Sequence, residues 1–297
     1  MKVAVLGATG TVGSALVPEL ARYHEVVAVS RRPTRRPPGV HWEAADATDG
    51  DALRRVLAGV EVAYYLVHSL GAPDFEERDR IAAAATARAA EESGIRQLIY
   101  LGGLSDHSQE LSPHLRSRAE TADILSSGRV PVTTLRAAMV VAAGSAAFET
   151  IVALVDRLPG MICPRWVSTP TQPIALQDIV TYLAGVAGRQ EALGAAFDAG
   201  GPEVMTYREM IERIARLRGK HPLIVEVPVL TPRLSSYWLT LVTPVQSRVA
   251  RALIEGLKNP TVARDDRLRH VVPLRLTGFD VAARAALDER ESRRTTP

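Results

Sequence analysis

Short apolar runs alternate along this chain with longer segments in which apolar residues recur every three or four positions. A run of about four to eight apolar residues indicates a buried strand, and the wider spacing indicates a helix that buries one face. The runs predict strands at 3–6, 25–30, 40–44, 61–67, 96–101, 131–141, 195–199 and 223–227. The periodic segments predict helices at 11–23, 49–58, 74–93, 114–127, 145–158, 176–188, 207–219 and, near the end, 280–291.

Regular alternation of strands and helices is typical of a parallel sheet with helices on both faces. We therefore expect an α/β fold in which residues 1–143 form a Rossmann-type, doubly wound parallel sheet and residues 174–199 return to it. Residues 144–173 and 200–297 are expected to form a smaller, mostly C-terminal substrate lobe. Within that lobe, the proline-rich and tryptophan-bearing stretch 159–173 is expected to be a loop.

Three glycines spaced three residues apart follow the first predicted strand. Gly7 allows a tight turn, Gly10 lets the backbone approach a diphosphate, and Gly13 lets the next helix pack on the strand. The spacing differs from G-x-G-x-x-G, so the strand–helix–strand context gives the pattern its weight. Amides at the start of that helix would face the anion. We predict that a nicotinamide dinucleotide is bound by Gly7, Thr9, Gly10, Thr11 and Val12.

The end of the second strand indicates which dinucleotide is bound. Proteins that bind NAD usually place Asp or Glu there, to accept a hydrogen bond from the ribose 2′-hydroxyl. Here the chain has Ser30, Arg31 and Arg32, a hydroxyl donor and two guanidinium groups that suit a 2′-phosphate. NADP(H) is therefore the favoured cofactor, with NAD(H) as the alternative. The arginines could instead only solvate a loop.

The ends of the other strands should line the same crevice, because parallel strands bring their carboxyl ends to one edge of the sheet. Asp46 is placed to approach the adenine, although it could instead cap the helix that starts near residue 49. His68 is interpreted as a wall residue. The predicted cofactor-binding residues at these ends are Asp46, Ala47, Leu66, Val67, His68, Leu101 and Gly102.

Composition narrows the class of protein. The 297 residues are 46% hydrophobic and 23% charged, which is typical of a globular protein with a full core. The net charge of +3 is small, so no nucleic-acid partner is expected. Cys163 is the single cysteine, which excludes an internal disulfide and a cysteine-based zinc site, and no metal is expected.

With no export pattern at its start and no apolar run near ~20 residues, the chain is expected to be cytoplasmic and without a transmembrane segment. Order is expected to fade in the polar end, 290–297.

Seven short motifs give the chain a resemblance to the atypical, extended short-chain dehydrogenase/reductases of the NmrA-like branch. They are GATGTVG (7–13), YLVHS (65–69), HLRSR (114–118), LRA (135–137), GSAAFE (144–149), PIA (173–175) and GGPE (200–203). The likeness covers nearly the whole chain and extends, more distantly, to the dinucleotide-binding accessory subunit of respiratory complex I. It implies that Arg136 and Ala137, standing where relatives commonly have Arg-Pro, lie beside the nicotinamide.

The chain departs from that superfamily at the catalytic pair. Active members use Tyr-x-x-x-Lys on a helix, in which Lys lowers the pKa of a Tyr that transfers a proton, yet no tyrosine here is followed by Lys four positions later. The corresponding helix carries His114 and Arg118, which share a face because they are four residues apart. His114 can exchange a proton near neutral pH, and Arg118 can hold ribose or phosphate oxygens. Both are candidate catalytic residues; the alternative is an arginine-rich surface helix.

Two functions follow from these observations. The first is an NADPH-dependent oxidoreductase that passes a hydride to a small carbonyl or activated alkene, with His114 as the proton source and Arg118 as the orienting group. The second is a non-catalytic NADP(H)-sensing protein of NmrA type, which regulates or assembles a protein partner. The missing Tyr-Lys pair favours the second, but the resemblance to a family of oxidoreductases favours the first, which is the function expected here with the sensor as the alternative.

Two apolar features remain open to more than one interpretation. Phe148 and Trp166 are candidates to wall a substrate pocket between the lobes, although ordinary core packing is the simpler interpretation. The stretch 234–245 is interpreted as a core helix, and a peripheral contact with a membrane or a membrane complex is the alternative.

Overall fold

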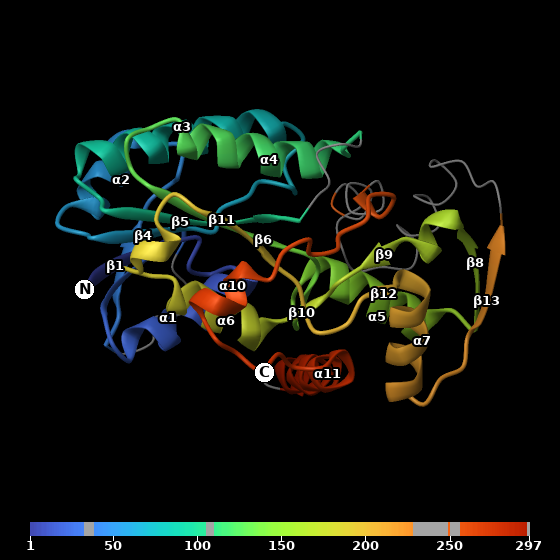
Figure 1. The fold of residues 1–297 in the computed structure, drawn as a ribbon. Helices are drawn as coiled ribbons and strands as arrows, with labels where there is room; N and C mark the ends of the chain where they lie inside the picture. Colours follow the sequence, from blue (N-terminus) through green and yellow to red (C-terminus); the bar gives the residue numbers. More distant parts are fainter. Residues whose placement is uncertain (33–38, 105–109, 228–248, 250–255, 296–297) are drawn as a thin grey trace.

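The computed structural model describes residues 1–32, 39–104, 110–227, 249 and 256–295. Its largest element is a seven-stranded parallel sheet with the order β11-β6-β5-β4-β1-β2-β3 (Figure 1). The strands are β1 (Lys2–Leu6), β2 (Glu25–Ser30), β3 (His41–Ala44), β4 (Val62–Tyr65), β5 (Gln97–Gly103), β6 (Val132–Ala137) and β11 (Ala196–Ala199). The strand order reverses at β1, where doubly wound proteins bind ligands outside the carboxyl edge of the sheet.

Helices cover both faces of this sheet (Figure 1). One face is covered by α2 (Gly50–Leu57), α3 (Phe75–Glu92) and α4 (Pro113–Ser126). The opposite face is covered by α1 (Thr11–Ala21), α6 (Leu176–Gly185) and α10 (Arg267–Val271). The predicted doubly wound α/β fold is confirmed.

Burial on both faces explains why β4 and most of β1 are apolar. In β1, Val3 and Val5 pack on the side of α1 and α6, whereas Ala4 and Leu6 pack on the side of α2 and α3. Successive side chains of a strand point to opposite faces, so a strand covered on both faces has no position suited to a polar side chain.

A second hydrophobic core lies beyond one end of the sheet (Figure 1). The helices α5 (Ala146–Arg157), α7 (Tyr207–Leu217) and α11 (Phe279–Thr295) surround it. Three short strand pairs complete this region: β7 (Val140–Val141) with β10 (Ile174–Ala175), β9 (Pro170–Thr171) with β12 (Met205–Thr206), and β8 (Gly160–Pro164) with β13 (Leu223–Val227). The short 3-10 helices are η1 (Arg165–Ser168) and η2 (Gln190–Ala192).

Three expectations about these boundaries are wrong. The predicted strand 131–141 is broken: β6 ends at Ala137, and the chain then joins a different pair as β7. The predicted loop 159–173 contains β8, which pairs with β13, a partner too distant in sequence for a local pattern to reveal. The polar end does not lose order at residue 290, because α11 continues to Thr295.

Ion pairs hold the polar end of α11 against the second core. The Arg290 side chain is 9% exposed, and its Nε donates to Glu149 Oε2 at 2.8 Å. Its Nη1 lies 3.4 Å from Asp156 Oδ2, and Arg218 Nε reaches Asp156 Oδ1 at 3.1 Å. The charged residues at this end therefore have partners on α5 and α7, which a reading of local polarity cannot detect.

Replacing Arg290 by alanine is expected to lower the free energy of unfolding by ~2 kcal/mol, because the mostly buried Glu149 carboxylate loses its ion-pair partner while Asp156 keeps Arg218. Differential scanning calorimetry should show this as a lower melting temperature. Arg294 is the matched control, since it lies on the same helix with an exposed side chain, and its replacement should cost less than ~0.5 kcal/mol. Equal melting temperatures for the two variants would show that the ion pairs of Arg290 do not stabilise the fold.

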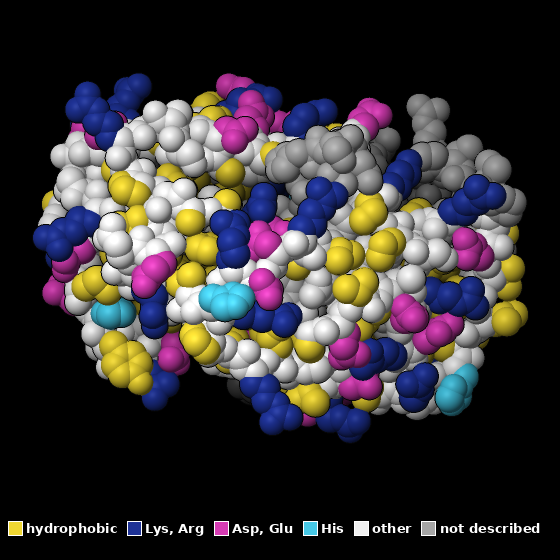
Figure 2. All heavy atoms as spheres, in the orientation of Figure 1, with side chains coloured by type: hydrophobic (Ala, Val, Ile, Leu, Met, Phe, Trp, Pro, Cys, Tyr) yellow, Lys and Arg dark blue, Asp and Glu magenta, His cyan; other side chains and the backbone are white. Residues whose placement is uncertain are grey.

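The visible surface is mixed in charge. On the face shown in Figure 2, basic and acidic side chains are interspersed rather than gathered into one patch. Within the described ranges, no helix has the length and apolar character needed to cross a bilayer. The apolar stretch 234–245 lies outside the described residues, so both interpretations of it stay predictions.

Candidate cofactor cleft and active site

The three glycines form a tight backbone turn between β1 and α1. Gly7 has a φ of +87°, and its amide donates to the Val29 carbonyl at 3.0 Å. A Cβ at Gly13 would lie 2.3 Å from the Gly7 carbonyl oxygen, so only glycine lets the helix approach the turn this closely. At Gly10 such a Cβ would lie 3.3 Å from the Gly7 carbonyl oxygen, a tight contact with backbone that also favours glycine. Such a cradle at a helix N-terminus suits a diphosphate.

A cleft of about 290 Å³ extends from this loop across the ends of β1, β2 and β4. It brings together most of the predicted cofactor residues: Gly7, Thr9, Gly10, Ser30, Arg31, Asp46, Ala47, Leu66, Val67 and His68. Arg32 lines an adjoining hollow that also includes Arg31 and Asp46. The parallel order of the strands brings these separate segments to one edge, and their mixture of backbone turn, donors and apolar wall fits a nicotinamide dinucleotide.

The Ser30 hydroxyl lines the cleft without a hydrogen-bond partner, so it is free to donate to a phosphate of the cofactor. The residue is only 7% exposed, yet its Oγ has no hydrogen-bond partner. Buried hydroxyls are nearly always hydrogen-bonded, so an unpaired one in a cleft points to a ligand atom. Arg31 follows it with an exposed side chain at the same cleft. A 2′-phosphate placed here would accept hydrogen bonds from both residues.

Asp46 lines the cleft, and its carboxylate already accepts hydrogen bonds from within the chain. It accepts hydrogen bonds from the Thr48 amide at 3.0 Å and the Thr48 hydroxyl at 2.8 Å. The amide hydrogen bond contributes most to lowering the pKa of Asp46, and the positive charges of Arg31 and Arg78 contribute less. The alternative interpretation of Asp46 as a helix cap is wrong, because Asp49 accepts from two backbone amides at the start of α2.

Sequence reasoning missed two residues near the start of α3. Arg78 lines the cleft. Asp79 is buried, and its carboxylate accepts from the Ser69 amide at 2.8 Å and from the Ser117 hydroxyl at 3.2 Å, which ties the loop after β4 to α4. A helix that follows a parallel strand starts at the ligand-binding edge, which was a usable signal. However, all five residues at 76–80 are charged, so the sequence did not show which of these side chains point into the protein.

His114 and Arg118 share one face of α4, as the spacing predicts. Burial lowers the pKa of His114 to about 3, with smaller effects from the positive charge of Arg118 and from His68. Arg118 also lowers the pKa of His68, together with burial. Burial, and to a smaller degree the positive charge of Arg118 one turn away, disfavour the protonated imidazole, so a neutral His114 is expected at pH 7. Its catalytic role stays a prediction.

The stability of the chain is expected to fall as the pH falls below ~6.5, the ordinary pKa of histidine in an unfolded chain. Folded His114 does not take up a proton until the pH reaches about 3, so the unfolded state binds more protons in between. Urea unfolding at pH 7 and pH 5 measures the effect. His114→Asn should lose less stability than the wild type between these two pH values. An equal loss would show that His114 does not cause this pH dependence.

Two predicted residues of the glycine loop face away from the cleft. The Thr11 hydroxyl donates to the Gly144 carbonyl at 3.1 Å, and the Gly144 amide donates to Glu149 Oε1 at 3.1 Å. Val12 packs against the core beneath the sheet. The side chain of Thr11 thus connects the loop to α5, while its role toward the cofactor stays a prediction.

Three further residues predicted to bind the cofactor have other surroundings in the structure. Arg136 forms an ion pair with Asp198 at 2.7 Å, because β6 and β11 are paired and place both side chains on one face. This pair holds the guanidinium at the edge of the sheet. The Leu101 carbonyl accepts from Arg118 at 3.5 Å. Gly102 is closed off by the Tyr100 ring, 3.0 Å from where a Cβ would stand.

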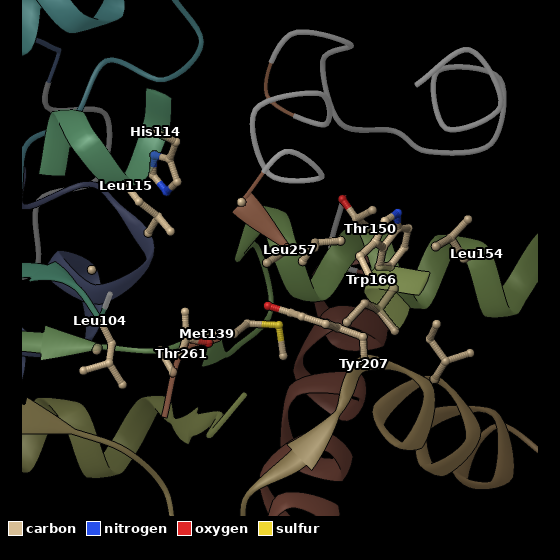
Figure 3. A pocket seen from close by; sticks show the side chains of 17 residues that line it. Leu104, His114, Leu115, Met139, Thr150, Leu154, Trp166, Tyr207, Leu257 and Thr261 are labelled. Atoms are coloured by element: carbon tan, nitrogen blue, oxygen red, sulfur yellow. The ribbon is translucent and has the colours of Figure 1, made fainter. Parts of the chain in front are cut away.

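A second cavity, of about 160 Å³, lies between the ends of β5 and β6 and the second core (Figure 3). It includes the candidate residues His114 and Ala137 and the predicted wall residue Trp166. Phe148, the other predicted wall residue, is fully buried in the second core. The described residues that line it are Gly103, Leu104, His114, Leu115, Ala137, Ala138, Met139, Ala147, Thr150, Ile151, Leu154, Trp166, Tyr207, Ile211, Gly256, Leu257 and Thr261.

Comparison with known proteins gives a family for the N-terminal half. Residues 7–153 match a family described as NAD(P)H-binding. A (4-alkanoyl-5-oxo-2,5-dihydrofuran-3-yl)methyl phosphate reductase from Streptomyces griseus is 26% identical over 220 residues, which are 73% of each chain.

Solved structures resemble the fold over nearly its whole length. A nucleoside-diphosphate-sugar epimerase from Staphylococcus aureus has a TM-score of 0.78 at 14% identity, covering 96% of this chain and 100% of its own. The Citrobacter sp. triphenylmethane reductase complexed with NADP(H) has a TM-score of 0.76 at 17% identity, with the same coverage. MoeE5 in complex with UDP-glucose and NAD has a TM-score of 0.75 at 19% identity and covers 100% of both chains. At these identities the likeness shows the fold alone.

Proposed function

We propose that this chain, whose residues 7–153 form an NAD(P)H-binding domain, is an NADPH-dependent reductase of a small carbonyl compound or a carbonyl-activated alkene. The resemblance to atypical short-chain dehydrogenase/reductases and the nicotinamide cofactor are both confirmed for that domain. The observation that carries the proposal is the position of His114, where an apolar cavity meets the end of β5 beside Arg118. A cofactor sensor needs the cleft but not this second cavity.

Bound NADPH would supply a hydride, and the chain supplies the surroundings of the acceptor. His114 is neutral at pH 7, so its N–H can donate to a substrate carbonyl oxygen as negative charge develops there. Burial, helped by the charge of Arg118, keeps the imidazole neutral, and Arg118 can hold cofactor oxygens. The proton that completes the reduction then comes from water. A conjugated alkene suits this arrangement, because an enolate is a weaker base than an alkoxide and needs no strong acid.

The name of the Streptomyces relative supports an alkene of this kind. That name describes a reductase of an oxo-dihydrofuran that carries an alkanoyl group, in which a ring double bond is conjugated with carbonyl groups. We extend only the reaction type to this chain, because the two sequences are 26% identical.

Arg31→Ala is expected to weaken NADPH binding by ~10- to 100-fold, because a charge-assisted hydrogen bond contributes ~1.5–3 kcal/mol. NADH, which lacks the 2′-phosphate, should bind within about twofold of its wild-type affinity. Isothermal titration calorimetry with both nucleotides measures the two effects. Arg88, exposed on α3, is the matched control. An equal loss for NADH and NADPH would remove the case for a phosphate-binding Arg31.

Turnover with a panel of enones and ketones tests the proposed function. We expect NADPH absorbance to decrease only when an acceptor is present. The alternative is a cofactor sensor, which the hydrogen bonds from Thr11 through Gly144 to Glu149 favour, since they connect the glycine loop to the second core. Tight NADPH binding without oxidation by any acceptor in the panel would overturn the reductase and support the sensor.

A further inference from the structure

The apolar cavity beside His114 has a size that restricts what can enter it. Its volume is about 160 Å³, close to that of an engineered apolar cavity of ~150 Å³ that holds benzene. Figure 3 shows His114 on the side of the sheet and Trp166 across from it, with Leu257 and Tyr207 between them in this view. The cavity therefore has room for one six-membered ring and a few further atoms.

The described wall of this cavity carries no formal charge at pH 7. Its one titratable histidine, His114, is neutral there, and its other members are apolar or carry a hydroxyl or indole group. Arg118 lies behind the wall: its Cγ is 3.7 Å from where a Cβ at Gly103 would stand. An anionic group inside the cavity would lose hydration without gaining a cationic partner from the described wall, which is unfavourable.

Apart from His114, one hydrogen-bond donor in the described wall is buried without a partner. The Thr150 hydroxyl donates to the Ala146 carbonyl at 2.7 Å, and Thr261 Oγ1 is hydrogen-bonded to Thr171 Oγ1 at 2.7 Å. Trp166 differs, because its Nε1 is buried and unpaired. A buried donor without a partner is unfavourable, and a ligand that brings an acceptor to it removes this penalty.

We propose that this cavity binds an uncharged, ring-sized apolar group of the substrate, with a hydrogen-bond acceptor on the side away from His114 that reaches Trp166 Nε1. This assignment rests on the proposed function, which puts the reacting carbonyl or alkene at His114. The substrate class is then an aryl or similarly sized cyclic enone without a phosphate or carboxylate on its ring. It differs from the phosphate ester named for the Streptomyces relative and from the UDP-glucose bound to MoeE5, both of which are anionic.

Three enone probes test each part of this assignment. They are 4-phenyl-3-buten-2-one, its 4-pyridyl analogue, which adds a ring acceptor, and its 4-carboxyphenyl analogue, which adds a charge. Dissociation constants are measured by calorimetry with saturating NADP⁺, so that no turnover occurs, and NADPH oxidation is measured separately. We expect the pyridyl probe to bind about 5- to 10-fold more tightly than the phenyl probe. The carboxylate should bind at least ~30-fold more weakly than the phenyl probe.

Two variants locate the binding. Trp166→Phe keeps an aromatic wall but removes the N–H, so the advantage of the pyridyl probe over the phenyl probe should disappear. Leu154→Phe fills the cavity and should weaken the phenyl probe by ~10-fold or more. Leu223→Phe makes the same exchange at a 70% exposed position on β13 and should change nothing.

The outcomes separate this assignment from the proposed function. Binding in the expected order without NADPH oxidation supports the cavity assignment and overturns the reductase. Oxidation of the carboxylate probe as fast as the phenyl probe, or equal weakening by the Leu154 and Leu223 variants, overturns the assignment and leaves the reductase standing. A pyridyl preference that survives in Trp166→Phe overturns the role given to the indole.

Discussion

Gly13→Ala is expected to weaken NADPH binding by ~100-fold or more, because it forces the glycine loop apart. The added Cβ would lie 2.3 Å from the Gly7 carbonyl oxygen and 2.9 Å from the Ala8 Cα. Both are backbone atoms, so no side-chain rotation can relieve the contact. The turn must move away from α1, which displaces the amides placed to bind the diphosphate. Calorimetric titration with NADPH measures the loss.

Gly50→Ala is the matched control for this variant. Gly50 also lies in the first turn of a helix, α2, and a Cβ there would meet no atom within 4 Å. Its replacement should leave NADPH binding unchanged and the melting temperature equal or slightly higher, since alanine favours helix. Circular dichroism establishes that both variants are folded at the titration temperature. An NADPH affinity of Gly13→Ala within threefold of the wild type would show that the loop does not hold the cofactor.

His114→Ala is expected to lower kcat for enone reduction by ~10²- to 10³-fold, the usual effect of removing one donor to a developing oxyanion. NADPH should bind within about twofold of its wild-type affinity, because His114 lines the apolar cavity and not the glycine-loop cleft. Steady-state rates with saturating NADPH measure the first quantity, and titration measures the second. A loss of kcat with unchanged cofactor binding would identify an interaction that forms in the transition state.

The role of a neutral donor can be separated from that of a proton source. His114→Gln keeps an N–H group and should recover at least about a tenth of the lost rate. The rate of the wild type should stay level between pH 6 and pH 9, because the pKa of His114 lies near 3. A rate that follows a group of pKa near 6.5 would restore the proton-source role instead. His221→Ala, at an exposed position, is the control for the loss of a histidine.

The local sequence was sufficient for the cofactor end of the site. The glycine loop, Ser30 and Arg31 all follow directly on strands whose apolar runs are unmistakable, and parallel strands bring such ends to one edge. The conformation of a glycine turn and the position at which a strand ends carry this information, and both are encoded over a few residues at a time. The sequence therefore predicted the fold, the strand ends and most of the residues that line the cleft.

The substrate end was decided by the tertiary structure. Its cavity is lined by residues from Gly103 to Thr261, which come together only when the second core packs against the sheet. The tertiary structure also places the half-buried His114 beside Arg118, which lowers its pKa, and the pairing of β6 with β11 joins Arg136 to Asp198 at the sheet edge. Burial, electrostatic interaction and pairing between distant segments depend on distances in space. A pattern read along the chain contains the residues that take part in them but not those distances.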